Sequence, residues 1–221
     1  MMLGLPSRAQ LTSTVGRGYI RRRAKLRGTS SFKSNPIPYR GKAEYKELIL
    51  KREVLEDLPK FQPKNAPYQS VDQFILRVTG AVVRPQTLRL EDILNLPKVN
   101  LTSDFTCVEG WSVKEIVWSG VRVKDLFTLA EPKSTGKYVL FKAGEFTKLM
   151  DIQSATRDDT ILTYKYKGEM LTYEHGAPLR LIFPSQQCYE SVKWVNEIEV
   201  LEQPIKDTGR DIALSRIQTK R

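Results

Sequence analysis

The sequence predicts an α+β fold, and three observations lead to this class. Runs of β-branched and aromatic residues with strand periodicity outnumber the stretches with helical periodicity. The two kinds of segment do not alternate steadily, as they would in a doubly wound parallel sheet. The chain has 221 residues, of which 40% are hydrophobic, and this suffices for one good-sized domain with flanking arms.

The predicted strands are recognised by alternation and by the turn residues that bound them. In residues 74–79 the apolar side chains of Phe74, Leu76 and Val78 fall on one face, and Gly80 ends the run. The same criteria predict strands over residues 138–141, 161–166, 179–183 and 192–201.

Apolar residues at steps of three and four predict the helices. Residues 44–58 read as one amphipathic helix, followed by a proline-rich linker over 59–69. Residues 88–96 read as a short strand that runs into a short helix closed by Pro97. A further helix is expected after Gly120, with apolar positions at 123, 126, 127 and 130, and it ends before Pro132.

The net charge of +11 is concentrated at the N-terminus. Residues 1–43 hold ten Lys or Arg and no Asp or Glu, whereas residues 44–221 hold 26 basic and 25 acidic residues. Such a segment buries too little apolar surface to fold alone, so a solvated basic arm is favoured. A nucleic-acid-binding arm suits the charge, but no interleaved aromatic residues or recognisable module accompany it. We predict four parts: the arm (1–43), the helix and linker (44–69), the domain (70–202) and a C-terminal tail (203–221).

Composition and motifs exclude several classes of protein. No stretch approaches the ~20 uninterrupted apolar residues of a membrane-spanning helix, so no membrane insertion is expected. Glycine-rich phosphate loops, zinc-protease and serine-hydrolase motifs do not occur in the sequence. The only histidine is His175, which excludes a metal site made of several histidines from one chain.

The cysteine count bears on compartment and chemistry. Cys107 and Cys188 stand 81 positions apart, which gives neither a zinc ribbon nor a disulfide-rich secreted scaffold. Residues 24–28 after the run Arg21 to Arg23 are not the apolar segment of an export signal, and we expect a cytoplasmic protein.

Cys107 lies at a loop or strand end. Its thiolate can bind a metal that has other ligands of its own, although a buried structural cysteine is the commoner case.

Arg180 is the second candidate functional residue. Strand alternation places it on the face opposite Leu179 and Leu181. Its guanidinium suits bidentate contact with a phosphate, with Lys193 as a further donor. A structural arginine in a salt bridge fits this pattern equally well.

An ordered series of motifs over residues 71–202 resembles the oxidoreductases with a molybdopterin-binding domain, the sulfite oxidase family. The series runs from Leu76-Arg77-Val78-Thr79-Gly80 through Cys107-Val108-Glu109-Gly110-Trp111-Ser112 and Trp118-Ser119-Gly120-Val121 to His175-Gly176-Ala177-Pro178-Leu179-Arg180 and Ser191-Val192-Lys193-Trp194. It is most similar to stand-alone sulfite-oxidase-like proteins and the bacterial methionine sulfoxide reductase catalytic subunit. The resemblance implies mixed β-sheets with short helices.

The resemblance also implies a cofactor, molybdopterin with one molybdenum. Cys107 corresponds to the family cysteine whose thiolate binds the metal. Glu109 corresponds to an acidic residue close to the metal that would tune a metal-bound oxygen or guide protons. Cys188 replaces the glycine usual in the family before Ser191, and we interpret it as structural.

The remaining cofactor contacts implied by the resemblance lie in the C-terminal part of the domain. His175 stands where relatives carry Asn or His facing the pterin. Arg180 corresponds to the arginine that binds the phosphate end of the cofactor. Ser191, Val192 and Lys193 correspond to the short segment that closes over it.

The reaction that the resemblance implies is two-electron oxygen-atom transfer at molybdenum, as in sulfite oxidation or sulfoxide reduction. The substrate would be a small molecule, and because the sequence has no haem domain, a separate protein or carrier would exchange electrons with the site. Two alternatives stay open. The chain could bind or carry molybdopterin without turnover, or it could bind nucleic acid through the basic arm.

Overall fold

The computed structural model describes residues 53–60, 67, 69–184 and 188–218, and the structural statements below concern these residues. The strands are β1 (Glu53–Leu55), β2 (Ile75–Gly80), β3 (Gln86–Arg89), β4 (Lys98–Thr106), β5 (Trp111–Arg122), β6 (Tyr138–Ala143), β7 (Phe146–Asp151), β8 (Ile161–Tyr166), β9 (Glu169–Met170), β10 (Arg180–Ile182) and β11 (Glu197–Leu201). The helices are α2 (Leu90–Leu94), α3 (Val123–Ala130), α4 (Ile152–Ala155) and α5 (Gly209–Gln218), and 3₁₀ turns form η1 (Val71–Gln73), η2 (Tyr173–His175) and η3 (Cys188–Glu190).

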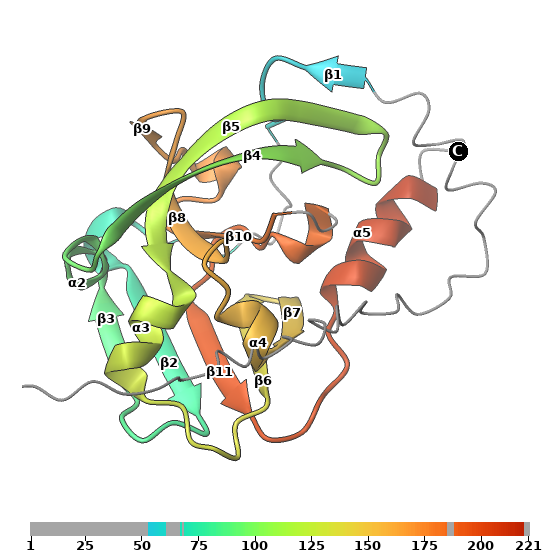
Figure 1. Cartoon of the computed structure of the whole chain (residues 1–221). Coiled ribbons are helices and arrows are strands. Elements are labelled where there is room, and N and C mark those ends of the chain that lie inside the picture. The colour runs from blue at the N-terminus through green and yellow to red at the C-terminus, as the bar shows by residue number, and fades with distance from the viewer. Residues whose placement is uncertain (1–52, 61–66, 68, 185–187, 219–221) are drawn as a thin grey trace, which may run out of the picture. The chain divides into compact units, whose positions relative to one another are not determined.

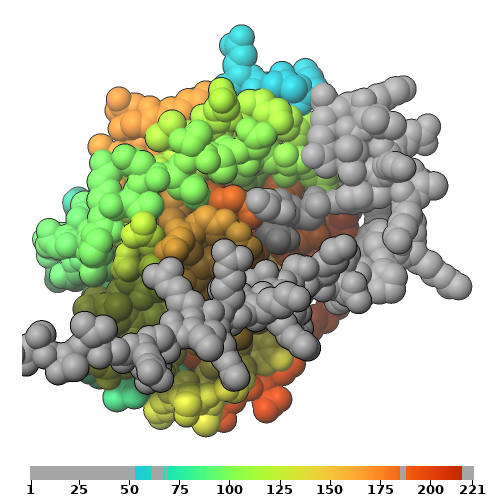
Figure 2. Space-filling model, viewed as in Figure 1, coloured from blue at the N-terminus to red at the C-terminus, as the bar shows by residue number. Residues whose placement is uncertain are grey.

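These strands form two mixed sheets (Figure 1). The first has the order β1-β5-β8-β10, with β4 beside β5 and β9 beside β8, and β1 runs parallel to β5 while the other pairs are antiparallel. The second has the order β3-β2-β11-β6-β7, with a parallel β11–β2 pair at its centre. In the space-filling view β1 lies along the rim formed by β5 (Figure 2).

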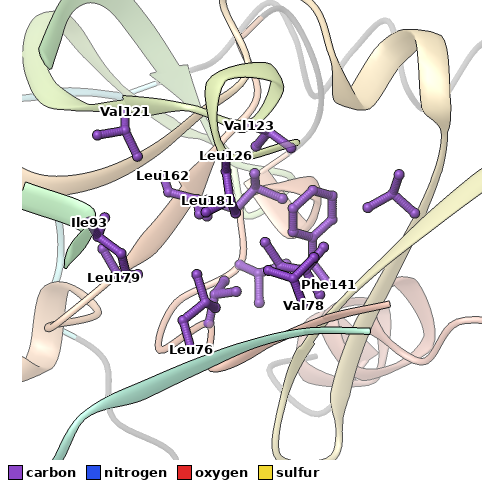
Figure 3. Packing of buried hydrophobic residues seen from close by; sticks show 14 of the residues in the cluster. Leu76, Val78, Ile93, Val121, Val123, Leu126, Phe141, Leu162, Leu179 and Leu181 are labelled. Atoms are coloured by element: carbon purple, nitrogen blue, oxygen red, sulfur yellow. The ribbon is translucent and has the colours of Figure 1, made fainter. Parts of the chain in front are cut away.

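The main core lies between the two sheets and takes side chains from both. Val121 and Leu162 come from the first sheet, Val78 and Phe141 from the second, and Leu126 from α3 (Figure 3). All are fully buried, and each buried side chain of this size contributes about 1.5–3 kcal/mol through loss of apolar surface to water.

A second cluster lies on the other face of the first sheet, around Phe105, Trp118 and Tyr166. Strand β5 serves both clusters because successive side chains of a strand point to opposite faces, which puts Trp118 in the second cluster and Val121 in the main core. A side chain at Gly120 would place its Cβ 2.2 Å from the carbonyl oxygen of Leu162, so only glycine fits this close crossing. The site described below lies in the second cluster.

The predicted fold class is confirmed, as are several elements. The predicted elements that form are the strands β2, β3, β6, β8 and β10 and the helices α2 and α3. The predicted boundaries between the four parts of the chain stay predictions.

Two expectations are wrong. The helix predicted over residues 44–58 is not helical where the structure describes it, because Glu53–Leu55 hydrogen-bond to β5 as strand β1; residues 44–52 lie outside the described part. The strand predicted from Val192 begins only at Glu197, since Trp194 has a left-handed backbone with φ of 58°. Within the segment predicted as the C-terminal tail, which stays a prediction, the structure has helix α5, which packs against β7 and η3.

Candidate active site

Cys107 lies in the turn that joins β4 to β5. Its backbone N–H donates to the carbonyl of Trp111 over 2.9 Å, and Gly110 N–H donates back to the Cys107 carbonyl over 3.2 Å. Gly110 closes this turn with a φ of 95°, a conformation that glycine adopts without strain. The turn fixes the Cys107 side chain at the strand end, where it is 6% exposed.

The sulfur of Cys107 lies 2.8 Å from the sulfur of Cys188, and both residues are free cysteines. The backbone N–H of Glu109 donates toward the Cys107 sulfur and that of Val108 toward the Cys188 sulfur. Hydrogen bonding to Cys188, followed by burial, raises the pKa of the Cys107 thiol, and the same hydrogen bond lowers the pKa of Cys188. Two negative charges at this separation repel strongly, so the two thiols do not both ionise.

Arg180 projects from β10 into the second cluster and is 3% exposed. Its guanidinium carbon lies 4.9 Å from the ring centre of Phe105 and 5.3 Å from that of Trp118. Nη1 donates to the carbonyl oxygen of His175 over 3.2 Å, whereas Nε has no acceptor among the described residues. Burial lowers the pKa of Arg180 to about 10, which still leaves the side chain charged at neutral pH. No carboxylate of the described residues forms a salt bridge with it.

His175 ends η2 and is buried. Its Nε2 lies 3.2 Å from the carbonyl oxygen of Leu58, and its ring packs 5.1 Å from that of Tyr166. The Tyr166 hydroxyl in turn donates to the carboxylate of Asp57. Burial lowers the pKa of His175, so the imidazole is neutral at pH 7.

The segment Ser191 to Lys193 is attached to β10 by its backbone and side chains. The N–H of Leu181 donates to the Val192 carbonyl over 2.8 Å, and that of Phe183 donates to Ser191 Oγ over 3.4 Å. Lys193 Nζ donates to the carbonyl of Glu174 over 2.5 Å. The segment therefore lies beside Arg180, with the Val192 side chain in the main core.

Glu109 is exposed on the same turn as Cys107. Its carboxylate interacts unfavourably with a negative charge on either Cys107 or Cys188. The structure thus places Cys107 near Glu109 on one side and near Arg180 on the other, with the His175 carbonyl bonded to Arg180.

Sequence reasoning missed Cys188 and the aromatic surroundings of Arg180. We interpret Cys188 from the sequence as structural, and the structure places its sulfur against that of the predicted metal ligand. The available signal was its position, since it is the only other cysteine and closely precedes Ser191. Nothing in the sequence indicates that Phe105, Trp118 and Tyr166 share a face, because this face arises from pairing between distant strands.

The donor set fits a cofactor that is anionic and already carries a metal. A buried cation with an N–H that lacks an acceptor is costly unless an anion such as a phosphate binds to it. A cysteine supplies one soft ligand, and the described residues contain no group of three or more side chains able to hold a metal alone. The site therefore defines a protein that binds a metal-bearing, phosphate-bearing cofactor.

Comparison with known proteins identifies this class. Residues 64–208 match the model of the oxidoreductase molybdopterin-binding domain family, and the chain belongs to that family. Its cofactor is accordingly molybdopterin, and the chain is a molybdopterin-binding oxidoreductase domain.

Several relatives are similar over part of their length. The uncharacterized oxidoreductase YuiH of Bacillus subtilis is 35% identical over 133 residues, which cover 60% of this chain and 67% of YuiH. Sulfite oxidase of Arabidopsis thaliana and the methionine sulfoxide reductase subunit MsrP of Campylobacter jejuni are each 28% identical, over 64% and 62% of this chain. The chain spans only 46% and 52% of these two proteins.

A solved structure supports the fold. The sulfane dehydrogenase SoxCD of Paracoccus pantotrophus superposes with a TM-score of 0.61 at 18% sequence identity, covering 82% of this chain and 57% of the SoxCD chain.

Proposed function

We propose that the chain is a molybdenum enzyme that transfers an oxygen atom to or from a small sulfur compound. The observation that carries this proposal is the buried Arg180, a cation without a carboxylate partner among the described residues, beside the buried thiol of Cys107. In the proposed site Arg180 and the Ser191–Lys193 segment bind the phosphate, His175 faces the pterin, and Cys107 is the metal ligand. The bound cofactor supplies two-electron oxygen-atom transfer.

Within this class we favour neutral sulfoxides over sulfite as substrates. Glu109 places a negative charge beside Cys107, and it would repel an anion that approaches the same position. The nearby cation, Arg180, is buried and assigned to the cofactor. The relatives support both reactions, since one is named a sulfite oxidase and another a methionine sulfoxide reductase subunit.

The decisive experiment compares both reactions on one preparation from a host that makes molybdopterin. We expect about one molybdenum per chain and turnover of an aryl or alkyl sulfoxide with a reduced dye as electron donor. Cys107→Ser should lower turnover about a hundredfold or more because the metal loses its soft ligand. Its pterin content should stay near that of the wild type, since Arg180 is unchanged.

Cys188→Ser is the matched control, because it removes the only other thiol. Full turnover in the Cys107 variant would contradict the assigned ligand role. Full occupancy without turnover of sulfite or sulfoxide would instead support a carrier function. The family match favours the enzyme over a carrier or a nucleic-acid-binding protein. The basic arm on which the last alternative depends lies outside the described residues.

We also propose a separate electron-transfer partner and a reducing, cytoplasmic location. Free thiols as close as those of Cys107 and Cys188 persist most readily where small thiols keep cysteines reduced. Among the described residues no helix combines the length and apolar character needed to cross a bilayer. Cell fractionation tests the location, and recovery in an oxidising compartment would contradict it.

A further inference from the structure

The sulfur pair Cys107–Cys188 has a second chemical capability besides metal ligation. The two sulfur atoms are 2.8 Å apart, and a disulfide bond requires ~2.05 Å. They come from a turn after β4 and from the first residue of η3, so the bond would link two segments already held side by side. A movement of ~0.8 Å separates the dithiol from the disulfide.

The surroundings of the pair favour exchange with a small disulfide. Cys188 is partly exposed whereas Cys107 is buried, so an external reagent reaches Cys188 first. The pair also lies beside the guanidinium of Arg180 and the backbone N–H groups of Val108 and Glu109. Thiol–disulfide exchange begins at the accessible sulfur of such a pair.

We propose that Cys107 and Cys188 form a reversible disulfide in the cofactor-free chain, and that this bond excludes the molybdenum of molybdopterin from Cys107. The reaction consumes one small-molecule disulfide of the glutathione type. The Cys188 thiolate attacks it and releases one thiol, and then Cys107 attacks the Cys188 sulfur and releases the second. Two electrons pass from the two cysteines to the reagent, and their two protons end on the released thiols.

Disulfide formation and metal binding would use the same sulfur atom, that of Cys107. A cysteine in a disulfide has no thiolate to give a metal, so disulfide formation and metal ligation compete for Cys107. Cofactor loading would then depend on the reducing state of the surroundings. This part rests on the proposed function, whereas formation of the bond itself does not.

The first measurement concerns the bond alone. The full chain, made in a host without molybdopterin, is reduced and then treated with oxidised glutathione. Trypsin releases Cys107 in the peptide of residues 99–114 and Cys188 in that of residues 181–193. We expect mass spectrometry to find these peptides linked, with release by dithiothreitol. Separate glutathione adducts on the two cysteines, without linked peptides, would overturn the proposal.

The second measurement concerns the competition. Oxidised and reduced chains are mixed with molybdopterin released from a donor molybdenum enzyme, and bound molybdenum is determined by elemental analysis. We expect at least tenfold less uptake by the oxidised chain, recovered on reduction. Cys188→Ser, and Cys188→Gly if the serine variant does not fold, should load equally with or without oxidant treatment. Equal uptake by linked and reduced wild-type chains would refute the competition.

The two measurements separate the possible failures. If the peptides are linked but the reduced chain takes up no molybdenum, the proposed function and the control of cofactor loading are contradicted. The reversible disulfide is then still supported.

Discussion

The guanidinium of Arg180 stacks against the indole of Trp118, with its carbon 5.3 Å from the ring centre. Both side chains are buried, and each has an N–H without an acceptor among the described residues: Nε of Arg180 and Nε1 of Trp118. Leaving buried donors unpaired costs about 1–3 kcal/mol each. The protein therefore maintains in its second cluster a polar arrangement that an anionic ligand would stabilise.

This arrangement predicts opposite effects of one substitution on binding and on folding. Arg180→Met should lower molybdopterin occupancy at least tenfold, because the phosphate loses its buried cation. The melting temperature of the cofactor-free chain should not fall, and a gain of about 1 kcal/mol would raise it by about 2–4 °C. Pterin content and thermal unfolding measure the two effects.

Arg157→Met is the control for this test. Arg157 is exposed and pairs with Asp159, so its loss should leave occupancy unchanged. A large drop in the melting temperature of the Arg180 variant would show instead that this residue is structural.

The charge of Glu109 predicts a change in substrate preference. Glu109→Gln should raise the ratio of sulfite oxidation to sulfoxide reduction about tenfold, which corresponds to removal of about 1.4 kcal/mol of repulsion. The gain should shrink as salt concentration rises, since the residue is exposed. Steady-state kcat/KM values for both substrates provide the measurement. Glu115→Gln, an exposed glutamate on β5, should leave the ratio unchanged, and an equal shift there would argue against a local effect.

The buried imidazole predicts how stability depends on pH. Because burial lowers the pKa of His175 in the folded chain, the unfolded chain binds its proton first as pH falls below ~6.5. The free energy of unfolding of the cofactor-free chain should therefore decrease from pH 7 toward pH 5, by at most about 1.4 kcal/mol per pH unit from this residue. Urea unfolding at several pH values checks this.

The variant His175→Gln removes the only imidazole in the chain. Its stability should be flatter across the same range. The same pH dependence in the wild type and the variant would assign the effect to other groups.

Part of this organisation could be predicted from the sequence. Alternation placed Arg180 opposite Leu179 and Leu181, and the structure has both leucines in the main core while Arg180 contacts Phe105 and Trp118. Periodicity also found α3, because its buried face follows a regular spacing of three and four residues. These are local patterns that one strand or one helix displays by itself.

The rest depends on contacts between distant segments. Residues 53–55 belong to a segment, 44–58, with a helical spacing of apolar residues, but hydrogen bonds with β5 hold them in a strand. The approach of Cys188 to Cys107 results from the packing of η3 against the β4–β5 turn, across 81 positions. No pattern of residue spacing along the chain indicates such a contact.

The crossing of β5 and β8 at Gly120 predicts a large loss of stability from a single methyl group. Gly120→Ala would place its Cβ 2.2 Å from the Leu162 oxygen and should cost about 2–4 kcal/mol. Gly168→Ala is the matched control, since Gly168 has a φ of 89° and open space around it, and should cost about 1 kcal/mol. Denaturant unfolding gives both values. Similar losses of unfolding free energy in the two variants would mean that β8 moves to accommodate the methyl group.

The alternation of side chains along β5 has a practical consequence for protein engineering. Trp118 lies in the second cluster beside Arg180, whereas Val121 lies in the main core, and both side chains are fully buried. A library aimed at new substrates should therefore keep both residues and randomise exposed positions of the β4–β5 turn, such as Glu109.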